Sequence, residues 1–378
     1  MTREDLNGTS LCRRGLPGFI LAVALAAGSL GALEAWEIRS IGGRDYIRMS
    51  EVAAFYDLTA EDPTDPNVLK FSGRDRELII TRNSRVVAIN GVNHWLAFPA
   101  VLVGGHTLIS RLDLGKTLEP ALRPQLIEGL TPVRTVVIDA GHGGRDKGAV
   151  GPYECEKNFA LDVARRVRDK LKKAGIPVVL TRNSDVFVEL QDRAAVAKRL
   201  PDSIFVSLHF NAANWNRDAN GFEIFCVTPR GAPSTEYDEL HERDMVAENG
   251  NEHDLHSFAL ANTIYHSMQG GMEMFDRGVK RARFAVLRLS TVPAVLIEGG
   301  FLTSPSDARK IASKGWRENY ASAIARGILE YSRLAGKGIP PRQVAEYKNG
   351  VEPRKSPVVM GTPTPVPEVT LRDLPAEN

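Results

Sequence analysis

Hydrophobic and polar positions follow two different patterns along the chain. Between about residues 36 and 125, short runs rich in Val, Ile and aromatic residues alternate with Gly, Asn and Asp breaks, as in "RELIITR" and "RVVAING". Such runs predict short strands. "YIRMSEVAAFYDL" and "TLISRLDLGKTLEPAL" each indicate a strand that continues into a short helix. We therefore expect residues 36–125 to form a small β-rich (α+β) accessory domain.

Strand and helix patterns alternate in the next region, residues 131–335. In "EKNFALDVARRVRDKLKKAG" apolar residues recur at every fourth position, which predicts an amphipathic helix that ends at Gly175. Predicted strands are "TVVIDA", "IPVVLTR", "SIFVSLHFNA", "GFEIFCVTP", "FAVLRLS" and "AVLIEGGF", with helices in "ELQDRAAVAKRL", "SFALANTIYHSM" and "NYASAIARGILEYSRLA". The alternation predicts an α/β domain, in which a mostly parallel twisted sheet has helices on both faces.

The two ends of the chain have a different character. Arg13 and Arg14 precede an apolar run that carries no charge until Glu34, a pattern typical of a signal peptide that is removed on export. A retained membrane anchor over residues 1–35 is the alternative. Residues 336–378 are rich in Pro and poor in periodic apolar positions, which predicts a disordered tail. We expect an exported protein, periplasmic or associated with the cell wall.

The charge and cysteine content limit the kinds of partner and of covalent cross-link that the chain is expected to have. The formal net charge is +2, and basic and acidic residues nearly cancel, so we expect no nucleic-acid partner. If the N-terminal segment stays uncleaved, it is the one part expected to contact a membrane. Cys12 lies in that segment, which leaves Cys155 and Cys226 without a CxxC motif. We expect two unpaired thiols, and a disulfide in an oxidising compartment stays open.

Polar side chains follow three of the predicted strands at the point where each strand ends. His142 follows "VVIDA", His209 follows "IFVSL" and Glu298 follows "AVLI". The carboxyl ends of parallel strands share one edge of a sheet, where ligand sites form. Glu156 joins them from the start of the next helix. Two imidazoles and a carboxylate are a common ligand set for catalytic Zn²⁺ with one open position.

Residues next to these positions support a metal site and leave open whether Glu154 or Glu156 is the carboxylate ligand. Gly141, Gly143 and Gly144 let the backbone turn sharply beside a bound ion. Glu154 competes with Glu156 as a ligand, but "EKN" runs directly into the apolar helix and favours Glu156. An acid that ends an apolar run, as Glu298 does, needs a partner, and a zinc-bound water is one.

Five motifs in this region resemble the zinc-dependent N-acetylmuramoyl-L-alanine amidases of the amidase-3 family. In chain order they are "VVIDAGHGGRDKGAVG", "EKNFAL", "SLHFNA", "RGVKRARFAVLR" and "PAVLIEGGFLTSPSD". The resemblance implies one Zn²⁺ per chain, bound by His142, Glu156 and His209, with Glu298 as the catalytic carboxylate. It implies hydrolysis of the amide between the muramic acid lactyl group and L-alanine, with peptidoglycan as the substrate. An activator or wall-associated protein is an open further partner.

The same resemblance suggests lesser roles for nearby residues. Asn211 and Arg182 match positions that line or brace the cleft, and we expect them to bind substrate. Arg193 is expected to form a structural ion pair. Residues 36–125 resemble the copper amine oxidase N-terminal-like domain in pattern, which does not imply copper binding.

Two other functions remain open from the sequence. A zinc peptidase of different specificity could use the same ligand set, although no HExxH motif is present. A catalytically silent wall-binding protein is the other alternative. The long acidic stretch at residues 232–252 is expected to be a surface loop, and the competing hypothesis is a lid over the zinc cleft.

Overall fold

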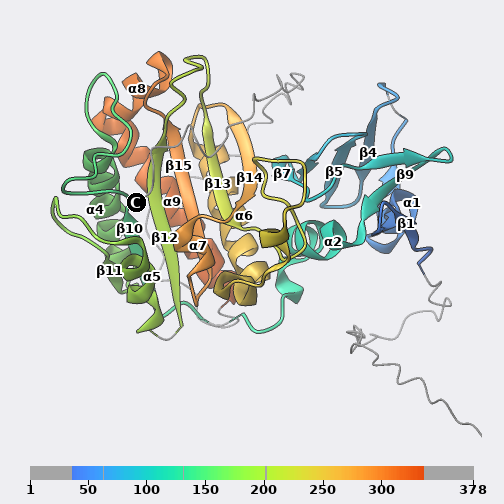
Figure 1. The fold of residues 1–378 in the computed structure, drawn as a ribbon, viewed down its shortest axis with the longest axis horizontal. Coiled ribbons are helices and arrows are strands. Elements are labelled where there is room, and N and C mark those ends of the chain that lie inside the picture. The colour runs from blue at the N-terminus through green and yellow to red at the C-terminus, as the bar shows by residue number, and fades with distance from the viewer. Residues whose placement is uncertain (1–35, 63, 131, 201, 336–378) are drawn as a thin grey trace, which may run out of the picture. The chain divides into compact units, whose positions relative to one another are not determined.

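The computed structural model describes residues 36–335 except residues 63, 131 and 201 (Figure 1). The predicted signal peptide or anchor at 1–35 and the predicted tail at 336–378 lie outside the described residues. Every helix and strand described below belongs to one compact unit, Glu37–Asn378. Among the helices described, none combines the length and apolar character that a bilayer crossing requires.

The β-rich region expected before the α/β domain is present. Its first sheet has the strand order β1, β2, β9, β8, and all of its pairs are antiparallel. The bounds are β1 Arg39–Ile41, β2 Arg44–Arg48, β8 Val101–Val103 and β9 His106–Ser110. Helix α1, Met49–Phe55, follows β2, and α2, Arg111–Asp113, follows β9, so both strand–helix units occur where the sequence predicts them.

A second set of strands in this region forms an antiparallel meander. It comprises β3 Thr59–Ala60, β4 Val68–Ser72, β5 Glu77–Thr81, β6 Val86–Ile89 and β7 Val92–Trp95. Helical turns then lead out of the region: η1 Leu114–Leu118, α3 Glu119–Leu122 and η2 Pro124–Leu126. The likeness to the copper amine oxidase module and the domain boundaries stay predictions.

The α/β region contains a mostly parallel sheet, as predicted. Its strand order is β11, β10, β12, β15, β13, β14, and only β13 and β15 pair in the antiparallel sense. The bounds are β10 Thr135–Ala140, β11 Val178–Leu180, β12 Ser203–Asn211, β13 Phe222–Val227, β14 Asp276–Ala282 and β15 Ala294–Phe301. β10, β12 and β15 therefore end at one edge of the sheet, and β13 and β14 begin there.

Helices cover both faces of this sheet (Figure 1). On one face Phe210 of β12 packs against Phe159 and Tyr320, which belong to α4 and α9. On the other face Phe205 and Leu296 pack with Ala197 of α5 and Leu287 of α7. The bounds are α4 Glu156–Lys173, α5 Leu190–Lys198, α6 Asp254–Gly271, α7 Ala285–Arg288, α8 Pro305–Ala312 and α9 Lys314–Ala335.

One predicted strand is wrong. "FAVLRLS" contains helix α7, Ala285–Arg288, and the strand lies earlier, at β14. β14 carries basic residues that look solvent-exposed in the sequence but are buried in ion pairs. Lys280 pairs with Glu223 at 2.5 Å, and Arg281 pairs with Asp254 at 2.6 Å. Paired charges can occupy a buried strand, so polarity alone misplaced this element.

The meander of the β-rich region continues the sheet of the α/β region. Strand β7 pairs with β14 through His94 and Val279, so the larger sheet runs from β11 to β3. The Nε2 atom of His94 lies 2.9 Å from Oδ1 of Asn262 on α6. The sequence gives no sign of this junction, because one bridge between two strands leaves no pattern.

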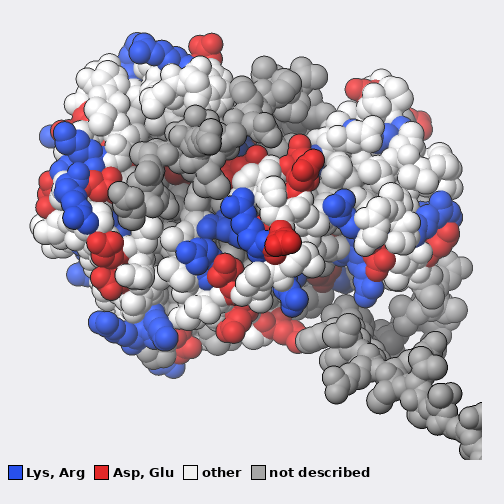
Figure 2. Space-filling model, viewed as in Figure 1, with Lys and Arg blue, Asp and Glu red and all other residues white. Residues whose placement is uncertain are grey.

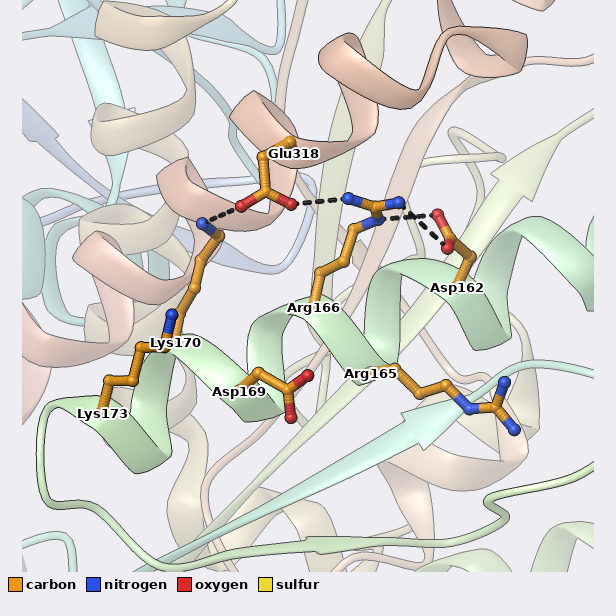
Figure 3. Close-up of a pocket in the computed structure, with 7 residues that line it drawn as sticks. All are labelled: Asp162, Arg165, Arg166, Asp169, Lys170, Lys173 and Glu318. Carbon is orange, nitrogen blue, oxygen red and sulfur yellow. Dashed lines mark hydrogen bonds and ion pairs between the residues drawn. The ribbon is translucent and has the colours of Figure 1, made fainter.

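Ion pairs fix α4, which begins with Glu156, against α9. Glu318 of α9 accepts hydrogen bonds from Lys170 at 2.5 Å and Arg166 at 2.6 Å (Figure 3). Asp162 bonds to Arg166 at 2.8 Å and to Arg317 at 2.5 Å. Asp162, Arg166, Lys170 and Glu318 line a polar hollow of about 370 Å³. It includes none of the candidate site residues, so we assign it a structural role.

The stretch at 232–252 contacts the β-rich region. Arg85 of the β-rich region donates to the carbonyl of Tyr237 at 2.7 Å, and Leu240 packs beside Tyr46 and Phe98. Two short 3₁₀ helices interrupt the stretch, η3 Glu242–Met245 and η4 Asn249–His253. The lid hypothesis stays a prediction.

The surface charge is mixed. On the face shown in Figure 2, acidic and basic side chains are interspersed.

Candidate active site

Three predicted ligand residues converge at the carboxyl edge of the sheet. Nε2 of His142 lies 3.0 Å from Oε2 of Glu156, and Nδ1 of His209 lies 2.9 Å from Oε1 of the same carboxylate. One ligand atom from each residue lies within 4.8 Å of the other two. Within the part of the chain that the structure describes, this is the one cluster of its kind.

The carboxylate at the centre of this cluster is held by backbone groups. Glu156 is 4% exposed, and its two oxygens accept hydrogen bonds from the amides of Ala149 at 2.8 Å and Phe210 at 3.0 Å. Glu154 is instead exposed and accepts a bond from the amide of Cys155. The structure thus brings Glu156 to the imidazoles and leaves Glu154 outside.

The loop that carries His142 is tightly constrained. His142 has φ +58°, a left-handed conformation that is uncommon for a residue with a side chain. Gly148, at φ +62°, crosses the cluster so closely that a Cβ atom there would lie 2.5 Å from Oε2 of Glu156. A Cβ on Gly141 would lie 2.4 Å from Cε1 of His209. The glycines predicted to allow a close approach thus include Gly141, and Gly148 adds a position that the prediction missed.

Asp146 is a second carboxylate at the site that sequence reasoning missed. Its Oδ2 lies 2.7 Å from Nδ1 of His142, and its Oδ1 accepts the amide of Gly148 at 2.9 Å. A carboxylate on one ring nitrogen directs the other nitrogen toward a metal. The sequence shows only that Asp146 follows His142 by four residues within the glycine-rich loop, and that spacing alone does not pair it with the imidazole.

Two buried arginines hold the His142 loop through hydrogen bonds to its backbone carbonyls. Arg182 donates to the carbonyls of Ala140 at 2.9 Å and Gly141 at 2.7 Å. Arg193 pairs with Asp139 at 2.9 Å and donates to the carbonyl of His142 at 2.8 Å. Arg182 is 3% exposed, so in this structure it braces the loop. Its predicted contact with substrate stays a prediction.

Glu298 lies beside the cluster on the neighbouring strand. Residues His209 and Glu298 are register partners on β12 and β15, which places both side chains on the same face of the sheet. The Oε2 atom of Glu298 is buried and has no hydrogen-bond partner. Burial, followed by the charges of Glu156 and Glu223, raises the pKa of Glu298 well above its usual value.

A further buried acid, Glu223, extends this row across the sheet. It is the β13 partner of Glu298, and it pairs with Lys280 and with Arg277, the latter at 2.8 Å. It also accepts the side-chain amide of Asn211 at 2.8 Å. Asn211 is therefore held in place by Glu223, and its predicted contact with substrate stays a prediction.

Charge coupling within the cluster is strong. Burial by itself lowers the pKa of His142, but the bonds to Glu156 and Asp146 outweigh it and raise the pKa to about 9. Burial raises the pKa of Glu156, yet its bonds to His142 and His209 lower it well below the usual value. The cluster therefore favours positive charge, and a divalent cation supplies it without protons on the imidazoles.

The residues present fit a catalytic metal centre. Two imidazoles and one carboxylate match the donor set of catalytic zinc, and Asp146 fixes the tautomer of one imidazole. The Oε2 atom of Glu298 is buried and has no hydrogen-bond partner, which costs free energy. A cation nearby would stabilise this oxygen. Fold and site together define a hydrolytic type of enzyme with a candidate metal centre at the edge of an α/β sheet.

Comparisons with known proteins agree with this class. Residues 136–330 match the family described as N-acetylmuramoyl-L-alanine amidase. YqiI of Bacillus subtilis, an uncharacterized protein, is 37% identical over 219 residues, which cover 58% of this chain and 93% of YqiI. The amidase AmiA of Escherichia coli is 32% identical over 220 residues, 52% of this chain and 76% of AmiA.

A solved structure is also similar to part of the chain. The amidase AmiC2 of Nostoc punctiforme has 35% sequence identity and a TM-score of 0.44, covering 52% of this chain and 96% of that one. Because the family match spans more than half of the 378 residues, the chain belongs to the N-acetylmuramoyl-L-alanine amidase family, whose members are peptidoglycan hydrolases.

Proposed function

We propose that the chain is a zinc-dependent amidase that hydrolyses the bond between the lactyl group of N-acetylmuramic acid and L-alanine of the stem peptide. The observation that carries the proposal is the convergence of His142, Glu156 and His209 within 4.8 Å, beside Glu298, whose Oε2 atom is buried. Family membership supports the substrate, and the donor set supports zinc.

Each residue has a defined task in this reaction. His142, Glu156 and His209 would hold the ion, and Asp146 orients His142 through Nδ1. An ion held there would supply Lewis acidity, which polarises a carbonyl and can lower the pKa of water from 15.7 toward about 7. Glu298 accepts a proton from the attacking water and transfers it to the nitrogen of L-alanine as the C–N bond breaks. The products are a free lactyl carboxylate and a stem peptide with a new amino terminus.

We also propose that the protein acts outside the cytoplasm, in the periplasm or the cell wall. Its substrate lies there, and the residues of the N-terminal segment match an export signal.

Zinc analysis together with product identification tests the proposal. The purified chain is expected to hold about one zinc ion, since one cluster of ligands is available. Digestion of isolated peptidoglycan is expected to release whole stem peptides that begin with L-alanine. Shortened peptides that remain attached to muramic acid would instead identify a peptidase. A folded, zinc-loaded chain that releases nothing would identify a silent wall-binding protein.

A further inference from the structure

The exposed aromatic side chains of the described residues share one edge of the sheet. Among the large hydrophobic side chains exposed within residues 36–335, three are aromatic: Tyr153 at 57%, Trp215 at 47% and Phe275 at 58%. Tyr153 follows β10, Trp215 follows β12, and Phe275 comes directly before β14. β14 begins at the edge where β10 and β12 end, so all three lie at the edge that holds the candidate active site.

Trp215 stands on an anchored turn. The amide of Ala213 donates to Oγ1 of Thr303 at 2.9 Å, and the amide of Asn216 donates to the carbonyl of Ala213 at 3.1 Å. At the other end of the same connection, Gly221 donates to Asp307 at 2.8 Å. The indole is therefore exposed from a turn whose backbone is bonded to the segment after β15.

Residues with polar groups suited to hydroxyl and amide ligands lie beside Trp215 in the sequence. Asn214 and Arg217 are both exposed and form no hydrogen bond or ion pair with other described residues. Phe275 lies at the far end of the connection, where its carbonyl accepts the amide of Phe222 at 3.1 Å. An apolar ring flanked by free amide and guanidinium donors offers both kinds of contact that an amino sugar makes, through its C–H face and its polar substituents.

Single exposed apolar residues are common and need no explanation. Here the location is informative, because every exposed aromatic side chain of the described residues lies at the catalytic edge. The amide that the proposed reaction cleaves is attached to a sugar within a strand. Its neighbouring sugars must therefore lie against the surface next to Glu298 and the metal ligands, where the aromatic side chains are.

We propose that Trp215, assisted by Phe275 and Tyr153, binds the glycan strand of peptidoglycan, with the indole stacked on a ring of an N-acetylated amino sugar. We call these three residues the aromatic rim. The inference rests on the proposed function, since it assigns the polymer that the active site acts on. It also predicts that the enzyme prefers strands to isolated muramoyl peptides.

Direct binding tests the aromatic rim without catalysis. In full-length protein made inactive by Glu298→Gln, calorimetry with peptide-free glycan strands measures the affinity. Adding Trp215→Ala is expected to weaken binding about tenfold, and Trp215→Phe is expected to retain most of it. Leu102→Ala removes an equally exposed side chain, 47%, on β8 and is the matched control, expected to bind as the parent does. Equal affinities of the parent and Trp215→Ala would overturn the proposal.

Kinetics on two substrates separate this proposal from the proposed function. In otherwise unaltered enzyme, the ratio of kcat/KM on glycan strands to kcat/KM on a single muramoyl peptide is expected to fall about tenfold in Trp215→Ala. An equal loss on both substrates would contradict a glycan-binding role. If the unaltered enzyme cleaves neither substrate, the proposed function fails, while the calorimetric result still decides whether Trp215 binds glycan.

Discussion

His209 and Glu298 lie opposite each other on adjacent parallel strands, β12 and β15, with their side chains on one face. Neighbouring strands are about 4.8 Å apart, so the sheet itself sets the spacing of these two side chains. In the proposed reaction, a proton acceptor held by the sheet needs no rearrangement to reach a water molecule near His209. The cluster and the acid are thus preorganised by the same hydrogen-bonded ladder.

Replacing Glu298 is expected to separate catalysis from metal binding. In Glu298→Gln the amide keeps the size of the side chain but cannot accept the proton, so the rate of peptidoglycan hydrolysis is expected to fall about 10²- to 10⁴-fold. Zinc content is expected to stay unchanged, because Glu298 is not one of the three clustered ligands. Release of stem peptides by liquid chromatography and metal analysis of the same sample measure both quantities. A variant with near-normal turnover would remove Glu298 from the mechanism.

The two acids before α4 provide a matched pair for the metal site. Glu156→Ala removes a proposed, buried ligand together with the acceptor of two backbone amides, so zinc is expected to be lost along with activity. Glu154→Ala removes an exposed carboxylate and is expected to retain zinc. Metal titration of the chelator-treated proteins checks this. Equal zinc affinity in the two variants would show that Glu156 is not a ligand.

The close approach of Gly148 to the cluster predicts a different effect. In Gly148→Ala the new methyl group would lie 2.5 Å from both Oε2 of Glu156 and Cδ2 of His142, so these two side chains must move apart. We expect zinc affinity to fall at least tenfold, by about 1.4 kcal/mol or more.

Gly175 supplies the control for that substitution. It also has positive φ, +84°, but a Cβ atom there would meet nothing within 4 Å. Gly175→Ala therefore introduces a backbone strain of about 1 kcal/mol without touching the site. It is expected to lower the free energy of unfolding, measured in denaturant, and to leave zinc affinity unchanged. Equal losses of zinc affinity in both variants would trace the effect to stability instead.

Much of the site could be predicted from the sequence because its residues lie in or just after the last part of parallel strands. The apolar runs before His142, His209 and Glu298 are buried strands, and parallel strands deliver the residues at their ends to one edge. Asp146 was missed because a carboxylate in a polar loop gives no periodic signal. Its role depends on the left-handed turn at His142, a tertiary feature that residue patterns do not encode.

β14 shows where polarity misleads a sequence-based prediction. Lys280 and Arg281 point to opposite faces of this strand, and each is buried against an acid from another element. The partners, Glu223 and Asp254, lie 57 and 27 residues away in the chain. Local pattern cannot reveal such pairings. The apolar stretch that looked like the strand forms α7 because its side chains cover the sheet from one side.

His94, at the junction of β7 and β14, predicts how stability depends on pH. Burial lowers the pKa of His94 to about 4, although its bond to Asn262 opposes this shift. The unfolded chain takes up a proton on this residue near its usual pKa of about 6.5, whereas the folded chain does so only near 4. Stability from neutral His94 is therefore present above pH 6.5 and is lost as pH falls to 4, by up to about 3 kcal/mol.

The variant His94→Gln isolates the contribution of His94 to the pH dependence of the free energy of unfolding. Glutamine can still donate a hydrogen bond to Asn262 but does not titrate, so the free energy of unfolding of the variant should fall less steeply between pH 6.5 and 4. Because both proteins share every other titrating group, the difference between their urea denaturation free energies reports on His94 alone. That difference is expected to shift in favour of the variant by about 3 kcal/mol across this range. Parallel pH profiles would mean that the β7–β14 junction opens enough to hydrate the imidazole.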